Sequence, residues 1–458
     1  MYNSIYIYFW KYNLACMKIA QFFLLTVICS LFAVQVHGQT VVFHDVNLLT
    51  MENNRVAANQ TVIVNNGVIK WVGPASEAEI PRGAEVISGD YYLMPGLAEM
   101  HAHIPSERQG EEYVSEVLKM YLSQGITTIR GMLGEPSHLE LRERAANGEI
   151  VSPRIFTSGP SFNGNSATSP EQARRMVREQ KAAGYDLLKL HPGLTREVFD
   201  AMADEANKQG MEFAGHISYD VGLEQTLEAG QGTIDHLDRY MEFLAGDAAN
   251  RPDPNIIYFG YDLTPHVDES LIDEAANRTL EAGVWNVLTN TLLENVFNPE
   301  NSVEKMMKWP GVDLMPENIV NGWQNYIRNI RSSDEYEPEQ ARDYLEFRKK
   351  LTLALHEAGA GLLLGADAPQ IFNPPGYSAH RELELLVESG LSPFEAIKTG
   401  TVNVGNYLGE PNQTGMVATG YRADLILLNV NPLESIPFGE NLEGVMVDGT
   451  WYWSGDLD

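Results

Sequence analysis

The sequence predicts an α/β fold, in which a (β/α)8 TIM-like barrel carries a small β-sandwich domain built from both chain ends. Three observations predict it: strand-like segments at each end, a long middle that alternates apolar runs with helical patterns, and metal-ligand-type residues where several runs stop. A chain of 458 residues, 44% hydrophobic and 21% charged, is long enough for one barrel and a smaller domain.

Residues 1–38 are typical of a secretory signal peptide. Lys18 supplies a positive charge, residues 22–34 form the apolar stretch, and residues 36–38 offer a small-residue cleavage site. The residues before Met17 do not resemble a charged leader, which makes Met17 a second candidate start. The apolar run is shorter than the roughly 20 residues of a spanning helix. We therefore expect an exported protein, periplasmic or secreted, with no stable membrane span after cleavage.

The cysteine content and the net charge limit which partners the protein can bind and which chemistry it can perform. Both cysteines, Cys16 and Cys29, lie in the removable segment, so the mature chain would contain no thiolate ligand or nucleophile. The formal net charge is −30 at pH 7. Such an acidic surface repels phosphate backbones and anionic lipid, which argues against nucleic acid and membrane surfaces as partners. A small-molecule or dipeptide substrate remains, and a homo-oligomer is possible.

The two chain ends are expected to pair into the β-sandwich domain, residues 39–93 and 412–458. The N-terminal part contains the turn Asn65-Asn66-Gly67 between two apolar runs, which is a strong hairpin signal. The C-terminal part has apolar runs at 424–428 and 444–447, followed by aromatic residues. The barrel, residues 94–411, would then be inserted between the two parts.

Residues 94–411 contain eight short apolar runs, several of them preceded by a glycine that can end a helix. Eight strand–helix units are what a barrel requires. The runs are 97–103, 126–132, 154–159, 186–190, 212–217, 233–237, 283–288 and 361–365.

The segment around residues 240–350 is longer than a compact strand–helix unit needs, and it is rich in Asn, Glu and aromatic residues. Insertions after barrel strands project over the active-site face, so we expect a partly helical lid. A surface elaboration or an oligomer contact fits the same composition nearly as well.

Five metal-ligand-type residues stand where the apolar runs end: His101, His103, His216, His236 and Asp367. A barrel brings the ends of its strands to one rim, so these side chains should share one pocket. His101 and His103 are two residues apart and would lie on the same face of a strand. Each histidine alone is as consistent with an ordinary core residue, but the set indicates a metal-dependent hydrolase.

Lys189 lies in an apolar run and is followed two positions later by His191. A snorkelling side chain would explain a lone lysine. In a metal site, however, a desolvated lysine has a lowered pKa, and its neutral amine can add carbon dioxide to form a carbamate that bridges two metals. His191 would be an alternative ligand or a substrate contact. Asp367 is the expected general base, because a carboxylate beside metal-bound water can accept its proton.

Several motifs resemble those of the amidohydrolase superfamily, in particular its imidazolonepropionase-like and prolidase-like branch. The resemblance implies that His101 and His103, with Asp367, hold one metal, that His216 and His236 hold a second, and that carboxylated Lys189 bridges two Zn²⁺ ions. It also implies that Tyr240 polarises the substrate carbonyl and that His380 contacts the substrate. Manganese, cobalt or iron could occupy the same ligands. The motifs are residues 94–103, His216, 234–236, 365–368, 382–386 and 420–425.

The resemblance leads us to expect an exported amidohydrolase that cleaves the C–N bond of a small substrate, such as an Xaa-Pro or Xaa-Arg dipeptide. A metal-bridged hydroxide would attack the carbonyl. Glu99 departs from the aspartate usual in the family, and Lys189 is absent from mononuclear imidazolonepropionases. The alternatives are a lactonase or phosphotriesterase-like enzyme, a cyclic-amide hydrolase, and a non-catalytic binding protein. A deaminase is disfavoured because no glutamate follows His216.

Overall fold

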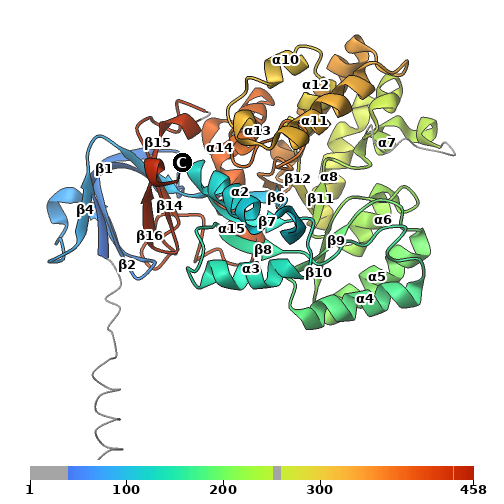
Figure 1. Cartoon of the computed structure of the whole chain (residues 1–458). Helices are drawn as coiled ribbons and strands as arrows, with labels where there is room; N and C mark the ends of the chain where they lie inside the picture. Colours follow the sequence, from blue (N-terminus) through green and yellow to red (C-terminus); the bar gives the residue numbers. More distant parts are fainter. Residues whose placement is uncertain (1–39, 251–258, 437, 458) are drawn as a thin grey trace, which may run out of the picture. The chain divides into compact units, whose positions relative to one another are not determined.

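The computed structural model describes residues 40–250, 259–436 and 438–457 (Figure 1). The chain divides into two units, Met1–Gln39 and Thr40–Asp458, and only the second is described here. The predicted signal peptide, residues 1–38, lies outside the described residues. Within the described ranges, no helix combines the length and apolar character needed to cross a membrane.

Strands from both ends of this unit form one eight-stranded sheet, in the order β16-β15-β14-β5-β1-β2-β3, with β4 paired to β1. The two ends join where β14 runs antiparallel to β5, with Ile426 opposite Met94. The expected pairing of the chain ends is therefore present, in a single sheet. Its strands are β1 (Thr40–Leu49), β2 (Val56–Asn65), β3 (Val68–Pro74), β4 (Glu85–Ser88), β5 (Tyr92–Pro95), β14 (Leu425–Leu428), β15 (Leu442–Val447) and β16 (Thr450–Trp453).

The predicted hairpin joins β2 to β3. Asn65 pairs with Val68 across the turn, and the two residues between them, Asn66 and Gly67, have φ angles of 52° and 69°. Asn and Gly tolerate this left-handed conformation best, which explains why the turn forms at this dipeptide.

The eight apolar runs of the middle each contain a strand, and these strands are parallel. They form a three-stranded sheet, β6-β7-β8, and a five-stranded sheet, β13-β12-β11-β10-β9. Isolated parallel bridges link the sheet edges, Ser158 with Leu187 and Ala102 with Ala368. The strands are β6 (Leu97–Ala102), β7 (Ile126–Gly131), β8 (Arg154–Thr157), β9 (Leu187–Leu190), β10 (Glu212–Gly215), β11 (Thr233–Asp235), β12 (Trp285–Val287) and β13 (Leu362–Leu363).

Helices connect successive strands and pack their apolar faces against them, which produces the largest buried cluster of the unit. Local signals set their ends: α4 starts after the N-cap Ser169, which accepts a hydrogen bond from the Gln172 N–H, and ends at Gly184 in a left-handed conformation. These helices are α2 (Glu111–Ser123), α3 (Ser137–Ala146), α4 (Pro170–Ala183), α5 (Arg196–Gln209), α6 (Gly222–Ala229), α8 (Ile272–Ala282), α12 (Pro338–Ala358), α13 (Tyr377–Glu388), α14 (Pro393–Thr399) and α15 (Val402–Tyr407).

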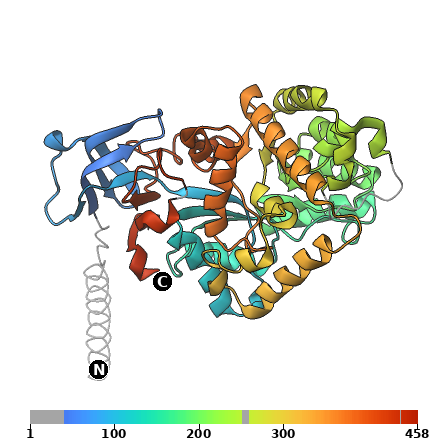
Figure 2. The same ribbon diagram turned by 90° about the horizontal axis from the view of Figure 1, so that it is seen from above.

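The long segment after β11 holds the crossover helix α8, strand β12 and most of α12, together with four further helices. Its helices gather on one side of the unit and share a second buried cluster that includes Tyr261, Phe297, Trp323 and Tyr344 (Figures 1 and 2). The segment was expected to be partly helical, and it is. The further helices are α7 (Tyr240–Ala245), α9 (Asn290–Phe297), α10 (Val303–Met306) and α11 (Glu317–Arg331).

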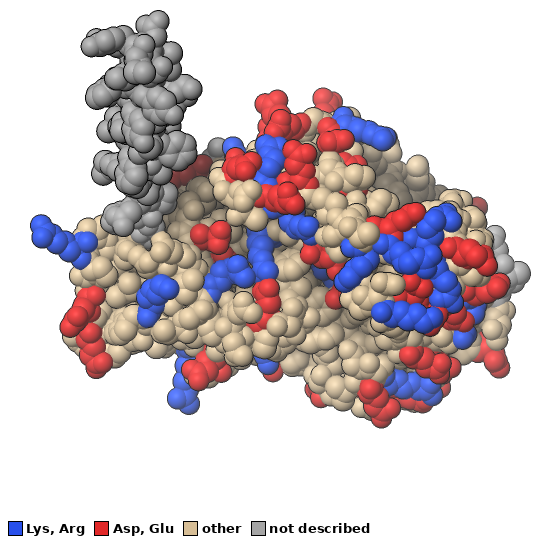
Figure 3. Space-filling model, turned by 90° about the horizontal axis from the view of Figure 1, so that it is seen from below, with Lys and Arg blue, Asp and Glu red and all other residues tan. Residues whose placement is uncertain are grey.

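The outer surface mixes acidic and basic side chains, as on the face drawn in Figure 3. Helices α4 and α5 are an example, because Arg174 lies 2.5 Å from Asp204 and Arg178 lies 3.2 Å from Glu205. Such exposed pairs contribute little to stability individually.

Candidate functional site

The candidate site is built where the parallel strands end. Because parallel strands run in one direction, their carboxyl ends meet at one edge and deliver side chains from distant parts of the chain to the same place. His101 lies in β6 and Lys189 in β9, while His103, His216 and His236 directly follow β6, β10 and β11. Asp367 lies four residues beyond the end of β13.

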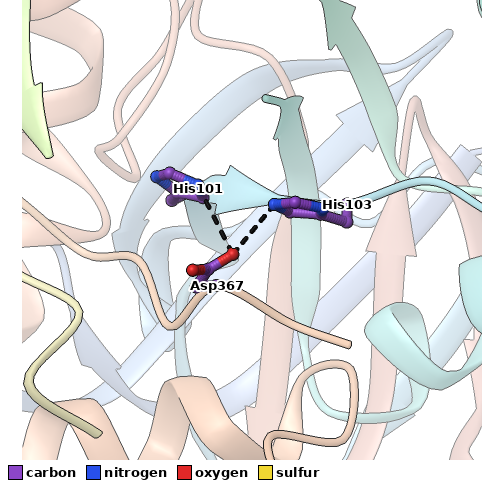
Figure 4. Close-up of side chains that lie close together, drawn as sticks. All are labelled: His101, His103 and Asp367. Carbon is purple, nitrogen blue, oxygen red and sulfur yellow. Dashed lines mark ion pairs between the residues drawn. The ribbon is translucent and has the colours of Figure 1, made fainter. Parts of the chain in front are cut away.

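Asp367 contacts two histidines at the centre of this edge. Its Oδ1 lies 2.8 Å from His103 Nε2 and 3.4 Å from His101 Nε2 (Figure 4). One ligand atom from each of the three residues falls within 4.8 Å of the others, a spacing that could hold one metal ion. Only His103 is partly exposed, with 20% of its side chain accessible, whereas His101 and Asp367 are buried.

The remaining histidines extend this group. The His236 ring centroid lies 4.7 Å from that of His101 and 4.5 Å from that of His216. His191, which follows β9, lies 5.2 Å from His216, and its buried Nδ1 has no hydrogen-bond partner among the described residues. The structure thus brings together all five predicted histidines of this edge with Asp367.

Three of the histidines have an oxygen atom beside Nδ1. Asp235 Oδ2 lies 2.9 Å from His101 Nδ1, and Asp238 Oδ2 lies 2.9 Å from His216 Nδ1. Thr289 Oγ1 lies 2.7 Å from His236 Nδ1. At His216 and His236 the contact is a hydrogen bond, and an oxygen acceptor at Nδ1 favours the tautomer whose Nε2 carries the lone pair, which is the usual arrangement around metal-binding histidines.

Lys189 lies next to this group with its side chain fully buried. Its Nζ is 3.3 Å from Asp235 Oδ2, so Asp235 faces both Lys189 and His101. Burial lowers the pKa of Lys189, although Asp235 opposes this shift. Burial alone would raise the pKa of Asp235, but Lys189 and His101 outweigh it and hold that pKa well below its usual range.

The residues present fit a divalent metal. Burial lowers the pKa of His101 to about 4 and that of His236 well below its usual value, so both imidazoles are neutral with a lone pair to donate. His236 Nε2 is buried and has no hydrogen-bond partner among the described residues, as expected of an atom whose partner is an ion. Nitrogen and oxygen donors of this kind suit zinc and similar ions.

Two of the candidate ligands, His236 and Asp367, have an uncommon backbone conformation. His236 and Asp367 have φ angles of 63° and 64°, a left-handed conformation that costs free energy in residues other than glycine and is found preferentially at functional sites. Gly215 precedes His216, and a Cβ there would lie 3.0 Å from Lys189 Nζ. A Cβ at Gly365 would lie 2.9 Å from the His101 N atom. Glycine at both positions therefore lets the strands approach the site closely.

Glu99, the residue that departs from the family pattern, is buried below the site. Its Oε1 accepts a hydrogen bond of 2.5 Å from the Ala366 N–H, which joins β6 to the residue before Asp367. Burial raises the pKa of Glu99 to about 8. The side chain thus helps to position Asp367.

Two predicted site residues lie elsewhere. The Tyr240 hydroxyl is fully buried and lies 2.7 Å from Thr279 Oγ1 of α8, and burial raises its pKa to about 12. His380 lies in α13 with its Nε2 2.9 Å from the Gln124 carbonyl oxygen, and burial lowers its pKa to about 4. Tyr240 packs against α8, whereas His380 also lines a cavity of about 450 Å³ together with Gln124, Thr291 and Asn373. The contacts with substrate expected of both residues stay predictions.

Sequence reasoning missed the residues that support the histidines, namely Asp235, Asp238 and Thr289, and it missed Phe259. The Phe259 ring lies 5.5 Å from the His236 ring and 6.3 Å from the His216 ring. Asp235 could have been found, because it directly precedes His236 in a buried strand where an unpaired carboxylate would be costly. Phe259 carries no comparable signal.

Known proteins resemble this chain along most of its length. Ochratoxinase from Aspergillus niger is 26% identical over 429 residues, covering 87% of this chain and 82% of that sequence. Imidazolonepropionase from Idiomarina loihiensis is 22% identical over 435 residues, covering 86% and 95%.

Solved structures share the fold. A bottromycin amidohydrolase superposes with a TM-score of 0.68 at 23% identity, covering 91% of this chain and 88% of the other. A Xaa-Pro dipeptidase superposes with a TM-score of 0.65 at 19% identity, covering 91% and 100%. The sequence model described as the amidohydrolase family matches residues 92–452. The chain therefore belongs to the amidohydrolase family and is a hydrolase acting on carbon–nitrogen bonds.

Proposed function

We propose that this enzyme hydrolyses the amide bond of a small substrate at the histidine–aspartate edge, with two divalent metal ions, zinc first among the candidates. The observation that carries the proposal is the position of the Asp367 carboxylate against His101 and His103. The His236 ring lies next to the His101 ring, and the His216 ring lies next to the His236 ring.

His101, His103 and Asp367 would hold one ion, and His216 and His236 the other. Such ions would supply activation of water and polarisation of the substrate carbonyl. The neutral imidazoles and the unpartnered His236 Nε2 support this assignment. Carboxylated Lys189 would be the bridge, supported by its complete burial at the same edge and by the glycine that leaves it room.

Asp367 would act as the proton carrier. Burial alone would raise its pKa, but the neighbouring His101 and His103 outweigh burial and hold that pKa well below its usual range, so the carboxylate is ionised at neutral pH. An ionised carboxylate can accept the proton of the attacking water and deliver it to the leaving amine nitrogen.

The proposed substrate class is a small amide with an apolar or cyclic group, including Xaa-Pro dipeptides, with Xaa-Arg dipeptides also considered. Phe259 supports the apolar part, because its half-buried ring lies beside two of the candidate ligands. The similarity to an ochratoxinase and to a Xaa-Pro dipeptidase fold supports amides of this kind. A cyclic amide is the second candidate, since imidazolonepropionases are among the relatives.

We also propose that the eight parallel strands act as one closed barrel, that the sheet of chain ends is part of a separate β-sandwich domain, and that helices of the 240–350 region form a lid. The bridges between the sheet edges support the first proposal, the β5–β14 pairing supports the second, and the second buried cluster supports the third. The signal-like segment supports export, which mass spectrometry of the secreted N-terminus, expected at Gln39, would test.

The function is tested with purified protein comprising residues 39–458, reconstituted with zinc. Release of free amine would be measured for Xaa-Pro and Xaa-Arg dipeptides, ochratoxin and a cyclic amide, and release of acid would be measured for a lactone and a phosphotriester. We expect turnover of at least one amide, its loss after chelation and its return with added zinc. Turnover of only the lactone or the phosphotriester, or amide turnover that survives complete chelation, would contradict the proposal.

A further inference from the structure

Arg348 is a buried residue of helix α12 that contacts the backbone of the candidate site. The Arg348 side chain is 3% exposed, and its guanidinium donates hydrogen bonds to two main-chain carbonyls: NH1 to the His236 oxygen at 2.8 Å and NH2 to the Leu288 oxygen at 2.9 Å. Nε and NH2 also donate to Asn290 Oδ1 at 3.2 Å and 3.0 Å. One side chain thus connects the end of β11 with the turn after β12.

The turn after β12, residues 288–291, is held from a second side. The Glu382 carboxylate of α13 accepts hydrogen bonds from the Asn290 N–H at 3.0 Å and the Thr291 N–H at 2.7 Å. A carboxylate at these amides suits the start of α9, where N–H groups lack helical partners. Arg348 and Glu382 therefore fix both the carbonyl and the amide groups of this turn.

The turn carries the residue that orients His236. Thr289 lies within it in a left-handed conformation with φ of 47°, and its Oγ1 is 2.7 Å from His236 Nδ1. The corresponding atoms of His101 and His216 face the carboxylates Asp235 and Asp238. His236 differs because the hydrogen-bond partner of its Nδ1 is a neutral hydroxyl, and the nearby carboxylate oxygen, Asp367 Oδ2, lies 4.0 Å away. The direction of that hydroxyl depends on the backbone that carries it.

We propose that Arg348 is a positioning residue for His236: by holding the His236 carbonyl and the Thr289 turn together, it keeps His236 in the tautomer whose Nε2 is free to bind metal. The inference deepens the proposed function and rests on it for the identity of the bound group. The planar guanidinium suits this task because its donors have fixed directions and reach three acceptors at once.

Arg331 provides a matched control within the same helical region. It also donates to three main-chain oxygens, those of Val296, Asn301 and Asn295, at 2.9, 2.8 and 2.7 Å. None of these residues is a candidate ligand. Arg331→Met should therefore remove a similar set of hydrogen bonds without affecting His236.

The test compares wild type, Arg348→Met, Arg348→Lys, Thr289→Val, Thr289→Ser and Arg331→Met in the full mature protein. Histidine ¹⁵N chemical shifts of the metal-free protein would give the His236 tautomer, and competition with a chelator would give zinc affinity. We expect the Nδ1–H tautomer in wild type, Thr289→Ser and Arg331→Met. It should be lost in Arg348→Met and Thr289→Val, together with roughly 10- to 100-fold of affinity at one of two zinc equivalents.

An unchanged tautomer and zinc affinity in Arg348→Met would overturn the inference, as would equal losses in Arg331→Met. Arg348→Lys keeps the charge without the planar fork and serves the same comparison if Arg348→Met does not fold. A wild type that binds no zinc or cleaves no amide would instead refute the proposed function. The tautomer comparison would still decide the role of Arg348, because it needs neither metal nor substrate.

Discussion

The strand ends and the helices that surround them contribute to the same site in different ways. The strand ends supply the candidate ligands themselves, His101, Lys189, His216, His236 and Asp367, each from a short local motif. The helices α8, α12 and α13 supply Thr279, Arg348 and Glu382, which contact backbone or core side chains instead. In the proposed function the reacting groups lie at the strand ends, while the helices hold the backbone and core side chains in place.

The largest effect should follow from changing a strand-end residue that carries a proton. Asp367→Asn keeps the size of the side chain but removes its basicity, so we expect kcat to fall by roughly 10²- to 10⁴-fold. Steady-state kinetics would measure this, with the exposed Asp343→Asn as control. Activity within a factor of three of wild type would assign the proton transfer to another group.

A second prediction concerns the buried carboxylate below the ligands. Asp235→Asn leaves the Lys189 ammonium without its counter-charge in a fully buried place and removes the carboxylate beside the His101 ring. We expect the free energy of unfolding of the metal-free protein to fall by about 3–5 kcal/mol. Chemical denaturation would measure it, with the exposed Asp273→Asn as control. Equal stability of both variants would show that this pair contributes nothing to folding.

A smaller effect is expected at His380, in helix α13. Burial lowers the pKa of His380 from 6.5 to about 4, so between these values the unfolded chain binds a proton that the folded chain does not. Because of this residue, the free energy of unfolding should fall by roughly 3 kcal/mol in total as the pH falls from about 6.5 to about 4. His380→Gln should lose less stability over that range and keep wild-type kcat/KM. A large fall in kcat/KM would restore the predicted substrate contact.

The smallest effect is expected at Tyr240. Tyr240→Phe removes the hydrogen bond with Thr279, which should lower the free energy of unfolding by about 1 kcal/mol. Because the hydroxyl faces α8, kcat should remain within about threefold of wild type, a difference below roughly 1 kcal/mol in activation free energy. A kcat loss above a hundredfold with unchanged KM would mean that the hydroxyl reaches the substrate carbonyl during turnover.

The sequence predicted the strands well because their signals are local. All eight apolar runs contain a strand, the Asn66-Gly67 hairpin forms, and the two chain ends pair through β5 and β14. The candidate ligands could be found for the same reason, since each lies within or after a short apolar run that its own local pattern marks.

The packing of Tyr240 against α8 could not be predicted from its spacing of four residues after His236. His236, Leu237 and Arg239 all have left-handed φ angles, so the chain turns sharply and directs Tyr240 toward α8. Non-glycine residues rarely adopt this conformation, and the sequence carries no signal for it. The contacts of Arg348 and Thr289 were equally hidden, because they join segments 53 to 112 residues apart.

Elemental analysis of purified wild type and Lys189→Ala tests most directly the proposed two-metal site, assembled at the strand ends and bridged by Lys189. We expect about two zinc ions per chain in wild type, with fewer in the variant and a matching loss of amide hydrolysis. One metal ion per chain in both proteins, with hydrolysis unchanged in Lys189→Ala, would contradict it and indicate a mononuclear site.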